Sequence, residues 1–276
     1  MKAYVSVDME GVAGISHPGP TKRADSGYPA AVELMVGEAN AAVEGALAGG
    51  ASEVLVNDSH GGMYNLRPAD VHPVARLLQG QKPWSMVAGA GPGAGFGVAL
   101  FVGYHARAGH PSGTIAHTYS GRPTVTRLDG RLVGETGINA AVLGAWGIPV
   151  GLVSGDDALA AEVDEWLPWA ERVVVKVAGG GSSAASLHPT AARDLIRAGA
   201  ERAVRRAAAG ELEPLVVGAP VVIEVEYVNG IVADYAAIVP GATRFGDRGV
   251  RVEGADSVTA YRGFLAGVRL AGIVDS

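Results

Sequence analysis

The sequence predicts an α/β fold: a mainly parallel sheet with helices on both faces, followed by a smaller C-terminal α/β unit. Short apolar runs rich in valine alternate with longer segments of helical periodicity through the first two thirds of the chain. This order is typical of parallel strands, because each parallel connection needs a crossover, usually a helix that covers one face of the sheet. Hydrophobic residues make up 48% of the 276 positions and charged residues 18%, so the chain can bury a large core.

Each predicted element is bounded by residues that start or stop it. The first helix, over 31–47, ends at two glycines, and the helix over 135–146 ends at Gly147. Asp129 and Gly130 predict a hairpin turn between strands 124–127 and 131–133. A further helix opens at His188 with proline in its first position and runs to 209. The other strands are predicted at 3–7, 53–56, 98–102, 150–153, 172–177 and 221–225, and the other helices begin near 156 and 256.

The glycine-rich segment 179–183 is the predicted domain boundary. It divides the chain into a larger α/β domain over 1–178, which holds the candidate metal residues below, and a smaller α/β domain over 179–276. A second glycine-rich segment, 89–97, does not match the dinucleotide-binding pattern and precedes a strand rather than a helix. We interpret both segments as surface loops.

Composition excludes several function classes. The net charge is −6 and no Lys/Arg block occurs, so binding to nucleic acid or to an anionic membrane is not indicated. The chain has no cysteine, which excludes disulfides and thiolate chemistry. A metal must then be held by His, Asp and Glu, a set that suits Zn²⁺ and also Mn²⁺ or Co²⁺. No signal peptide and no apolar run of roughly 20 residues is visible, so we expect a soluble cytoplasmic protein.

Two carboxylates, Asp8 and Glu10, stand where the first predicted strand leaves the core. Residues i and i+2 of a strand share a face, so both side chains can point at one spot. Like charges held that close repel unless a proton or a cation lies between them. The alternative is a solvated strand end followed by a turn at Gly11.

Three more candidates belong to the same edge of the sheet. His60 and His105 follow the strands over 53–56 and 98–102, and Glu135 opens a helix. Because the carboxyl ends of parallel strands form the ligand crevice, we expect these side chains to converge with Asp8 and Glu10. Glu135 could instead be a first-turn acid favoured by the helix dipole. Helix capping is the stronger interpretation of Asp156, and four histidines in loops receive no chemical role: His17, His72, His110 and His188.

Five nitrogen and oxygen ligands exceed the three that typically hold one catalytic zinc. They suit two ions that share a carboxylate, with Asp8 as the bridge. Two such ions support metal-assisted hydrolysis, because they activate water and polarise a carbonyl or phosphoryl group. His117, in the strand-rich segment that follows, is then the natural proton-transfer or oxyanion group outside the ligand set.

Six motifs occur in this order along the chain, at residues 6–11 (SVDMEG), 38–42 (EANAA), 56–60 (VNDSH), 103–108 (GYHARA), 134–140 (GETGINA) and 154–157 (SGDD). Together they resemble the zinc-dependent D-aminopeptidases of the dipeptide-transport operon type (DppA family). The resemblance covers nearly the whole chain. It implies an α/β protein with a binuclear zinc centre that releases N-terminal D-amino acids from short peptides, and a ring-shaped homo-oligomer, a decamer. Asp8, Glu10, His60, His105 and Glu135 match the family's metal ligands, and His117 matches its catalytic histidine.

Two other functions fit the same residues. A two-metal phosphoesterase would use the same ligands and would want a cation for the phosphate, for which Arg107 is the candidate. A metal-dependent peptide-binding accessory protein of a transporter would bind without hydrolysis. The segment after Lys176 is less polar here than in a relative of the DppA family, which has an arginine near the position of Gly181. If this segment contacts the peptide, the substrate preference can differ, so D-selectivity is the weakest implication of the resemblance.

Overall fold

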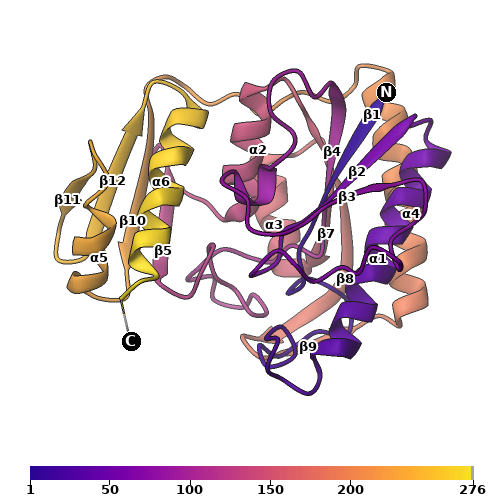
Figure 1. Ribbon diagram of the computed structural model, residues 1–276, viewed down its shortest axis with the longest axis horizontal. Helices are drawn as coiled ribbons and strands as arrows, with labels where there is room; N and C mark the ends of the chain where they lie inside the picture. The colour runs from indigo at the N-terminus through magenta and orange to yellow at the C-terminus, as the bar shows by residue number, and fades with distance from the viewer. Residues whose placement is uncertain (275–276) are drawn as a thin grey trace.

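The computed structural model describes residues 1–274 and contains two β-sheets (Figure 1). The first sheet has seven strands in the order β3-β2-β1-β4-β7-β8-β9, and each pairing is parallel except that of β8 with β9. These strands are β1 (Lys2–Val7), β2 (Glu53–Asp58), β3 (Arg76–Leu78), β4 (Phe96–Val102), β7 (Val150–Asp156), β8 (Glu171–Gly180) and β9 (Ser183–Ser186). The predicted mainly parallel α/β fold is confirmed.

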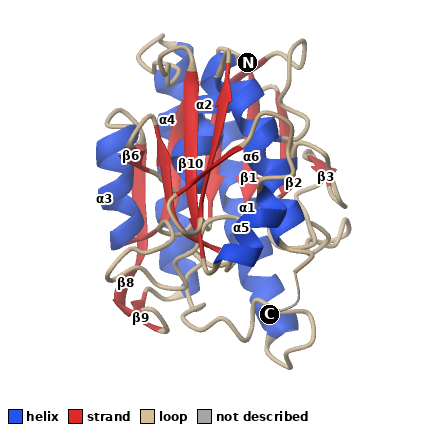
Figure 2. Cartoon of the chain, turned by 90° about the vertical axis from the view of Figure 1, so that its left-hand side faces the viewer, coloured by secondary structure: helices blue, strands red, loops and turns tan. Residues whose placement is uncertain are grey.

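Helices cover both faces of the first sheet because both faces of its strands are apolar. In β1, Tyr4 packs into one hydrophobic core and Val5 into the other, on the opposite face. Helices α1 (Tyr28–Ala48) and α4 (Pro189–Ala208) pack together on the Val5 side. Helices α2 (Glu135–Ala145) and α3 (Asp157–Trp166) cover the Tyr4 side (Figures 1 and 2).

The second sheet is antiparallel, in the order β11-β12-β10-β5-β6. Its alternating strands bury one face: Val250 and Val252 of β12 are buried, and Arg251 between them is exposed. Helix α6 covers that buried face and contacts α2. The elements are β5 (Pro123–Leu128), β6 (Arg131–Leu132), β10 (Val221–Tyr227), β11 (Thr243–Phe245), β12 (Gly249–Gly254), α5 (Gly230–Ala236) and α6 (Ser257–Ala271).

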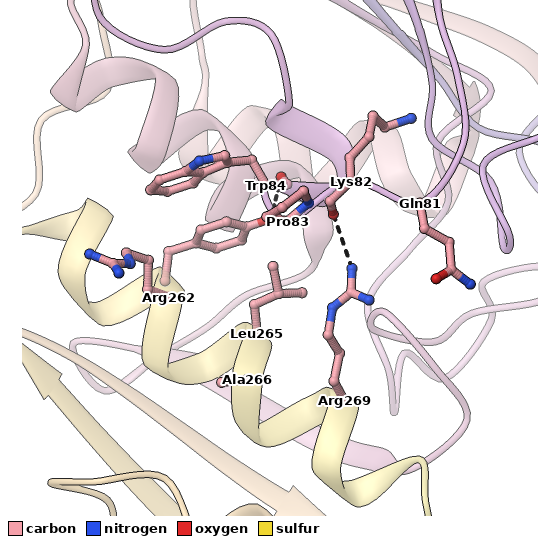
Figure 3. Close-up of a pocket in the computed structure, with 9 residues that line it drawn as sticks. Gln81, Lys82, Pro83, Trp84, Arg262, Leu265, Ala266 and Arg269 are labelled. Carbon is pink, nitrogen blue, oxygen red and sulfur yellow. Dashed lines mark hydrogen bonds between the residues drawn. The ribbon is translucent and has the colours of Figure 1, made fainter.

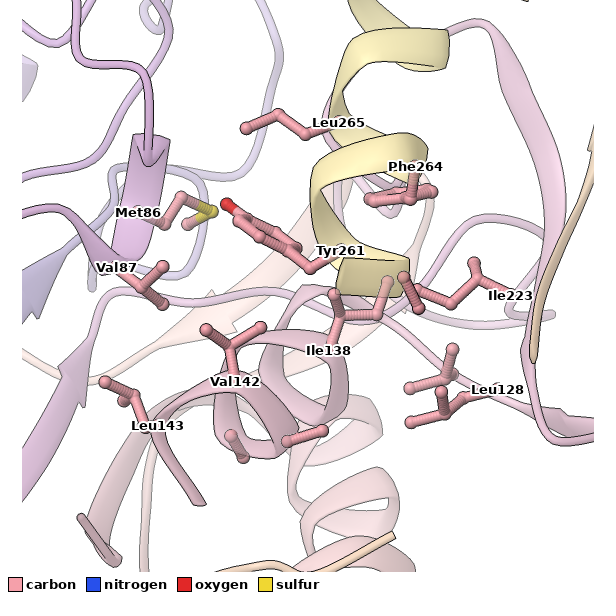
Figure 4. Packing of buried hydrophobic residues seen from close by; sticks show 14 of the residues in the cluster. Met86, Val87, Leu128, Ile138, Val142, Leu143, Ile223, Tyr261, Phe264 and Leu265 are labelled. Atoms are coloured by element: carbon pink, nitrogen blue, oxygen red, sulfur yellow. The ribbon is translucent and has the colours of Figure 1, made fainter. Parts of the chain in front are cut away.

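The two sheets share one hydrophobic core through the α2–α6 contact. Ile138 of α2, Tyr261 of α6 and Ile223 of β10 belong to a single buried cluster (Figure 4). The same cluster contains Tyr4 of the first sheet. Tyr261 also donates a hydrogen bond from its hydroxyl to the carbonyl of Trp84, 3.1 Å away. The smaller sheet is therefore fixed against the larger one by buried apolar area.

The assignment of strands to the two sheets does not change at the predicted boundary, residue 179. The hairpin of β5 and β6 lies before that position but belongs to the second sheet, whereas β9 and α4 lie after it and pack with the first. The glycine-rich segment 179–183 is the turn of the β8–β9 hairpin rather than an open linker, since Gly180 pairs with Ser183. Whether 1–178 and 179–276 behave as separate domains remains a prediction.

The strand order creates a switch point between β1 and β4. From β1 the chain moves outward through β2 and β3, then returns to place β4 on the other side of β1. In open α/β sheets ligands bind outside the carboxyl ends of the strands at such a point. Asp8 follows β1 directly and His105 follows β4, so the fold brings the predicted residues to this crevice.

Within residues 1–274, no helix combines the length and the apolar character needed to span a membrane.

Candidate metal centre

A cavity of about 290 Å³ lies at the carboxyl ends of β1, β2 and β4. Five of the six predicted site residues line it directly, and the sixth, His105, lies 3.4 Å from two of them, Asp8 and Glu135. The five predicted ligands are almost fully buried, with 2–7% of their surface exposed. Residues far apart in the chain thus form one compact polar cluster inside a largely apolar fold. The described lining is Asp8, Glu10, Ser59, His60, Gly61, Met63, Ser85, Met86, His117, Tyr119, Ser120, Glu135, Leu265, Val268 and Arg269.

His60 faces two carboxylates with one ring nitrogen. Its Nδ1 lies 3.2 Å from Oδ1 of Asp8 and 3.0 Å from Oε2 of Glu10. Its Nε2 lies 2.9 Å from the carbonyl oxygen of Thr21, which can only accept, so Nε2 carries the proton. In the neutral ring the Nδ1 lone pair therefore points at two carboxylates, an arrangement that needs a positive charge between them.

His105 repeats this arrangement on the other oxygen of Asp8. Its Nδ1 donates to the carbonyl of Ala106 at 3.0 Å, and its Nε2 lies 3.4 Å from both Oδ2 of Asp8 and Oε1 of Glu135. Nε2 is buried and has no hydrogen-bond partner among residues 1–274. Metal-binding histidines commonly donate their other N–H to a backbone carbonyl, so this orphaned nitrogen fits a metal ligand.

The cluster carries an excess of negative charge that draws protons in the absence of a metal ion. Burial and the neighbouring Glu10 raise the pKa of Asp8 to about 7. Burial opposes the charging of His105, yet the carboxylates of Glu135 and Asp8 raise its pKa to about 10. The pKa of His60 is likewise well above its usual value, since Glu10 and Asp8 outweigh its burial. A divalent cation would replace these protons, so the donor set and the charge both fit a metal.

His117 lies beside the ligand cluster in a different electrostatic setting. Its ring stacks on that of His105, with the centroids 4.0 Å apart, and its Nδ1 donates to the carbonyl of Ile115 at 2.8 Å. Its Nε2 is 3.8 Å from Oε1 of Glu135. Burial and the positive charge of His105 lower the pKa of His117, so this histidine is neutral when its neighbours are charged. A quarter of the side chain is exposed, which leaves its edge open to the cavity.

Backbone-binding side chains hold the loops that carry these residues. Asp58 accepts hydrogen bonds from the backbone N–H groups of Asn65 and Leu66 and so closes the loop that follows His60. Asp156 caps α3 by accepting from the backbone of Leu159, as predicted, and it also accepts from the N–H of Thr114 in the segment that carries His117.

Lys176 is a buried residue beside the cluster that the sequence prediction missed. Its side chain is 1% exposed, and its ammonium group donates to the backbone carbonyls of Glu10, Val12 and Ile15. Burial lowers its pKa to about 8. The signal was present, because a single lysine inside the apolar run 173–177 requires buried acceptors.

The remaining candidates lie elsewhere. Arg107 is held by Glu162, with Nε 3.7 Å from Oε1, and donates to the carbonyl of Ala108, so its guanidinium is engaged away from the cavity. Glu135 does open α2, as the helix-dipole interpretation requires, but it also faces His105 and accepts from the N–H of Tyr119. In each of four loop histidines, Nδ1 accepts from a backbone N–H within three residues: His17, His72, His110 and His188.

Comparisons with known proteins agree over nearly the whole chain. The family model described as D-aminopeptidase matches residues 1–266. The D-aminopeptidase of Bacillus subtilis (strain 168) is 35% identical over 273 residues, which is 98% of each protein. A solved structure described as the Zn-dependent D-aminopeptidase DppA from Bacillus subtilis, a self-compartmentalizing protease, superposes with a TM-score of 0.92 at 34% identity and covers all of both chains.

Proposed function

This chain belongs to the D-aminopeptidase family of peptidases, and on that premise we propose that it is a zinc aminopeptidase with two ions per chain. Its reaction is the hydrolysis of short peptides, with release of N-terminal D-amino acids. Peptide hydrolysis follows from the family. The two ions, the residues that hold them and the D-selectivity are the proposal.

The observation that carries the binuclear proposal is the position of Asp8. Its Oδ1 faces His60, and its Oδ2 faces His105. One ion would be held by Asp8, Glu10 and His60, and the other by Asp8, His105 and Glu135. Zinc at these residues supplies a Lewis acid that activates water and polarises a carbonyl group.

His117 is the proton carrier of the proposal. Its Nδ1–H is fixed on the carbonyl of Ile115, so its Nε2 is the atom free to accept and return a proton. Burial, the largest cause of its lowered pKa, favours the neutral ring, which can accept a proton. Amide hydrolysis requires a proton on the leaving nitrogen, and Nε2 at the edge of the cavity can deliver it.

The same family supports an oligomer. The solved relative is described as a self-compartmentalizing protease, and we extend this to the present chain as a homo-oligomer, a decamer. A closed assembly would restrict access to short, flexible peptides. Size-exclusion chromatography with light scattering measures the assembly directly.

The alternatives predict different activities. Arg107, the cation that the sequence suggested for a phosphoesterase, pairs with Glu162 and does not line the cavity. A non-catalytic accessory protein would bind peptides without hydrolysing them and would need no proton carrier. The zinc-loaded protein should therefore be assayed with D-alanyl and L-alanyl p-nitroanilides beside p-nitrophenyl phosphate. Release of p-nitroaniline from the D-substrate supports the proposal, whereas phosphatase activity alone or no activity would reject it.

The matched control for this assay is Asp8→Asn. A neutral amide is a poor bridge between two cations, so this variant should bind less zinc and lose the activity. Activity that persists in Asp8→Asn after removal of loosely bound zinc would show that Asp8 does not hold the catalytic metal.

A further inference from the structure

A second cavity, of about 600 Å³, lies along α6 (Figure 3). We call it the α6 pocket. One wall is the segment over 81–84, and the other is the face of α6 that includes Tyr261 and Leu265. Its described lining is Gln81, Lys82, Pro83, Trp84, Tyr261, Arg262, Leu265, Ala266 and Arg269.

The α6 pocket and the metal cavity are neighbours that share part of their lining. Leu265 and Arg269 line both. Along the chain, Trp84 lines the α6 pocket and the next residue, Ser85, lines the metal cavity. An extended molecule whose first residue lies at the metal cavity can therefore place its next residues in the α6 pocket.

The α6 pocket is positively charged in a chain whose net charge is −6. It contains the guanidinium groups of Arg262 and Arg269, and no carboxylate lies among the described residues that line it. Neither arginine forms an ion pair in the part of the chain that the structure describes. Arg269 donates to the carbonyl of Lys82 at 3.2 Å (Figure 3), and its side chain also lines the metal cavity.

Aromatic and aliphatic side chains form much of the remaining wall, beside Gln81 and Lys82. The rings of Trp84 and Tyr261 stack with their centroids 6.4 Å apart and 12° between their planes. Arg262 lies 5.9 Å from the centre of the Trp84 ring. Such a wall can contact the aliphatic part of a small residue, while the guanidinium groups of the pocket can bind an anion.

We propose that the α6 pocket binds the C-terminal residue of the peptide substrate and that Arg269 pairs with its terminal carboxylate. This inference rests on the proposed peptidase function. Arginine presents two parallel N–H donors that match a carboxylate, which gives strength and orientation. A favourable interaction with the helix dipole could explain Arg269 in the last turn of α6, but not a second arginine two turns earlier on the same cavity.

The test compares two peptides that differ only at the C-terminus. A dipeptide and a tripeptide of D-alanine are each assayed with a free carboxylate and as the C-terminal amide, on the zinc-loaded protein. The wild type should prefer the free acid in kcat/KM by roughly 10- to 100-fold, the range for a hydrogen-bonded charge. In Arg269→Gln the ratio of kcat/KM for the free acid to that for the amide should fall towards one, mainly because KM for the acid rises. Arg269→Lys should retain part of the preference for the acid.

Arg251→Gln is the matched control, since Arg251 lies on the second sheet and pairs with Glu224 and Glu253 instead of lining the pocket. Its ratio should equal that of the wild type. The proposal would be overturned if Arg269→Gln lowered kcat/KM equally for the free acid and the amide, or if the oligomeric mass of that variant changed. If the wild type cleaves neither peptide, the proposed function fails. Calorimetric titration of the same uncleaved peptides then tests whether the α6 pocket binds the terminal carboxylate. Equal affinity for the free acid and the amide would reject that role.

Discussion

Replacing Lys176 with methionine should weaken the metal site without touching a metal ligand. Lys176 lies on β8, and its ammonium group binds the backbone carbonyls of Glu10, Val12 and Ile15. It therefore fixes the turn on which Glu10 is presented. Methionine has similar length but donates no hydrogen bond, so three buried carbonyls lose a donor.

The magnitude follows from two opposing terms. Three hydrogen bonds from a charged donor contribute roughly 4.5–9 kcal/mol in total. Against this, burial lowers the pKa of Lys176 from 10.5 to about 8, which corresponds to a cost of about 3 kcal/mol for keeping the charge. The net destabilisation in Lys176→Met is then about 1.5–6 kcal/mol. Zinc affinity should fall roughly 10- to 100-fold, as for other residues that position a ligand.

The assay pairs chemical unfolding of the metal-free protein with zinc competition against a chelator. Val175→Ala on the same strand is the control, because Val175 is fully buried and its truncation should cost about 2 kcal/mol without removing a donor. Lys176→Met should lose zinc affinity beyond the control. Equal zinc affinity in the two variants, at comparable loss of stability, would refute the positioning role of Lys176.

Two further predictions concern His117 and Glu38. His117→Ala should lower kcat by roughly 10²–10⁴-fold while the zinc content stays constant, and loss of zinc from this variant would move His117 into the ligand set. Glu38 is buried and its pKa is raised from 4.5 to about 7 by desolvation, so the folded state keeps a proton that the unfolded state releases and stability falls as pH rises through this range. Between pH 6 and 8 the wild type should lose about 1 kcal/mol relative to Glu38→Gln in chemical unfolding, and parallel stability curves would contradict the assigned cause.

Local patterns predicted most elements of the fold correctly. The helix that ends before Gly49, the hairpin at Asp129 and Gly130, and the helix capped by Asp156 each depend on a few neighbouring residues. In the hairpin both turn residues have positive φ, 48° and 79°, as the tight turn requires. Such signals are contained within a short stretch of sequence and do not depend on the rest of the chain.

The assignment of elements to sheets could not be predicted. Nothing in strand 123–128 indicates that its partner is β10, almost a hundred residues later, rather than β4 nearby. The helix over 189–208 packs on α1 because both carry small residues at their contact: a Cβ on Gly45 would lie 2.2 Å from the carbonyl oxygen of Arg197. That contact is a property of two surfaces, and a single helical pattern does not contain it.

The candidate site was more predictable than the fold around it. Strand ends are visible in the sequence, and a parallel sheet places them at one edge, so Asp8, His60 and His105 could be grouped from the sequence alone. The residues that the sequence prediction missed contact the site through backbone carbonyls or through the packing of the second sheet's helix on the first. Lys176 binds carbonyls about 160 residues away in sequence, and Arg269 reaches the cavity only because α6 packs on α2.

Metal stoichiometry decides whether Asp8 bridges two ions in a binuclear centre. Zinc content per chain should be measured by elemental analysis on protein of known specific activity, during stepwise reconstitution of the metal-free form. Activity should reach its plateau at two zinc ions per chain, and Asp8→Asn should fail to bind both. Full activity at one ion per chain would contradict the binuclear centre.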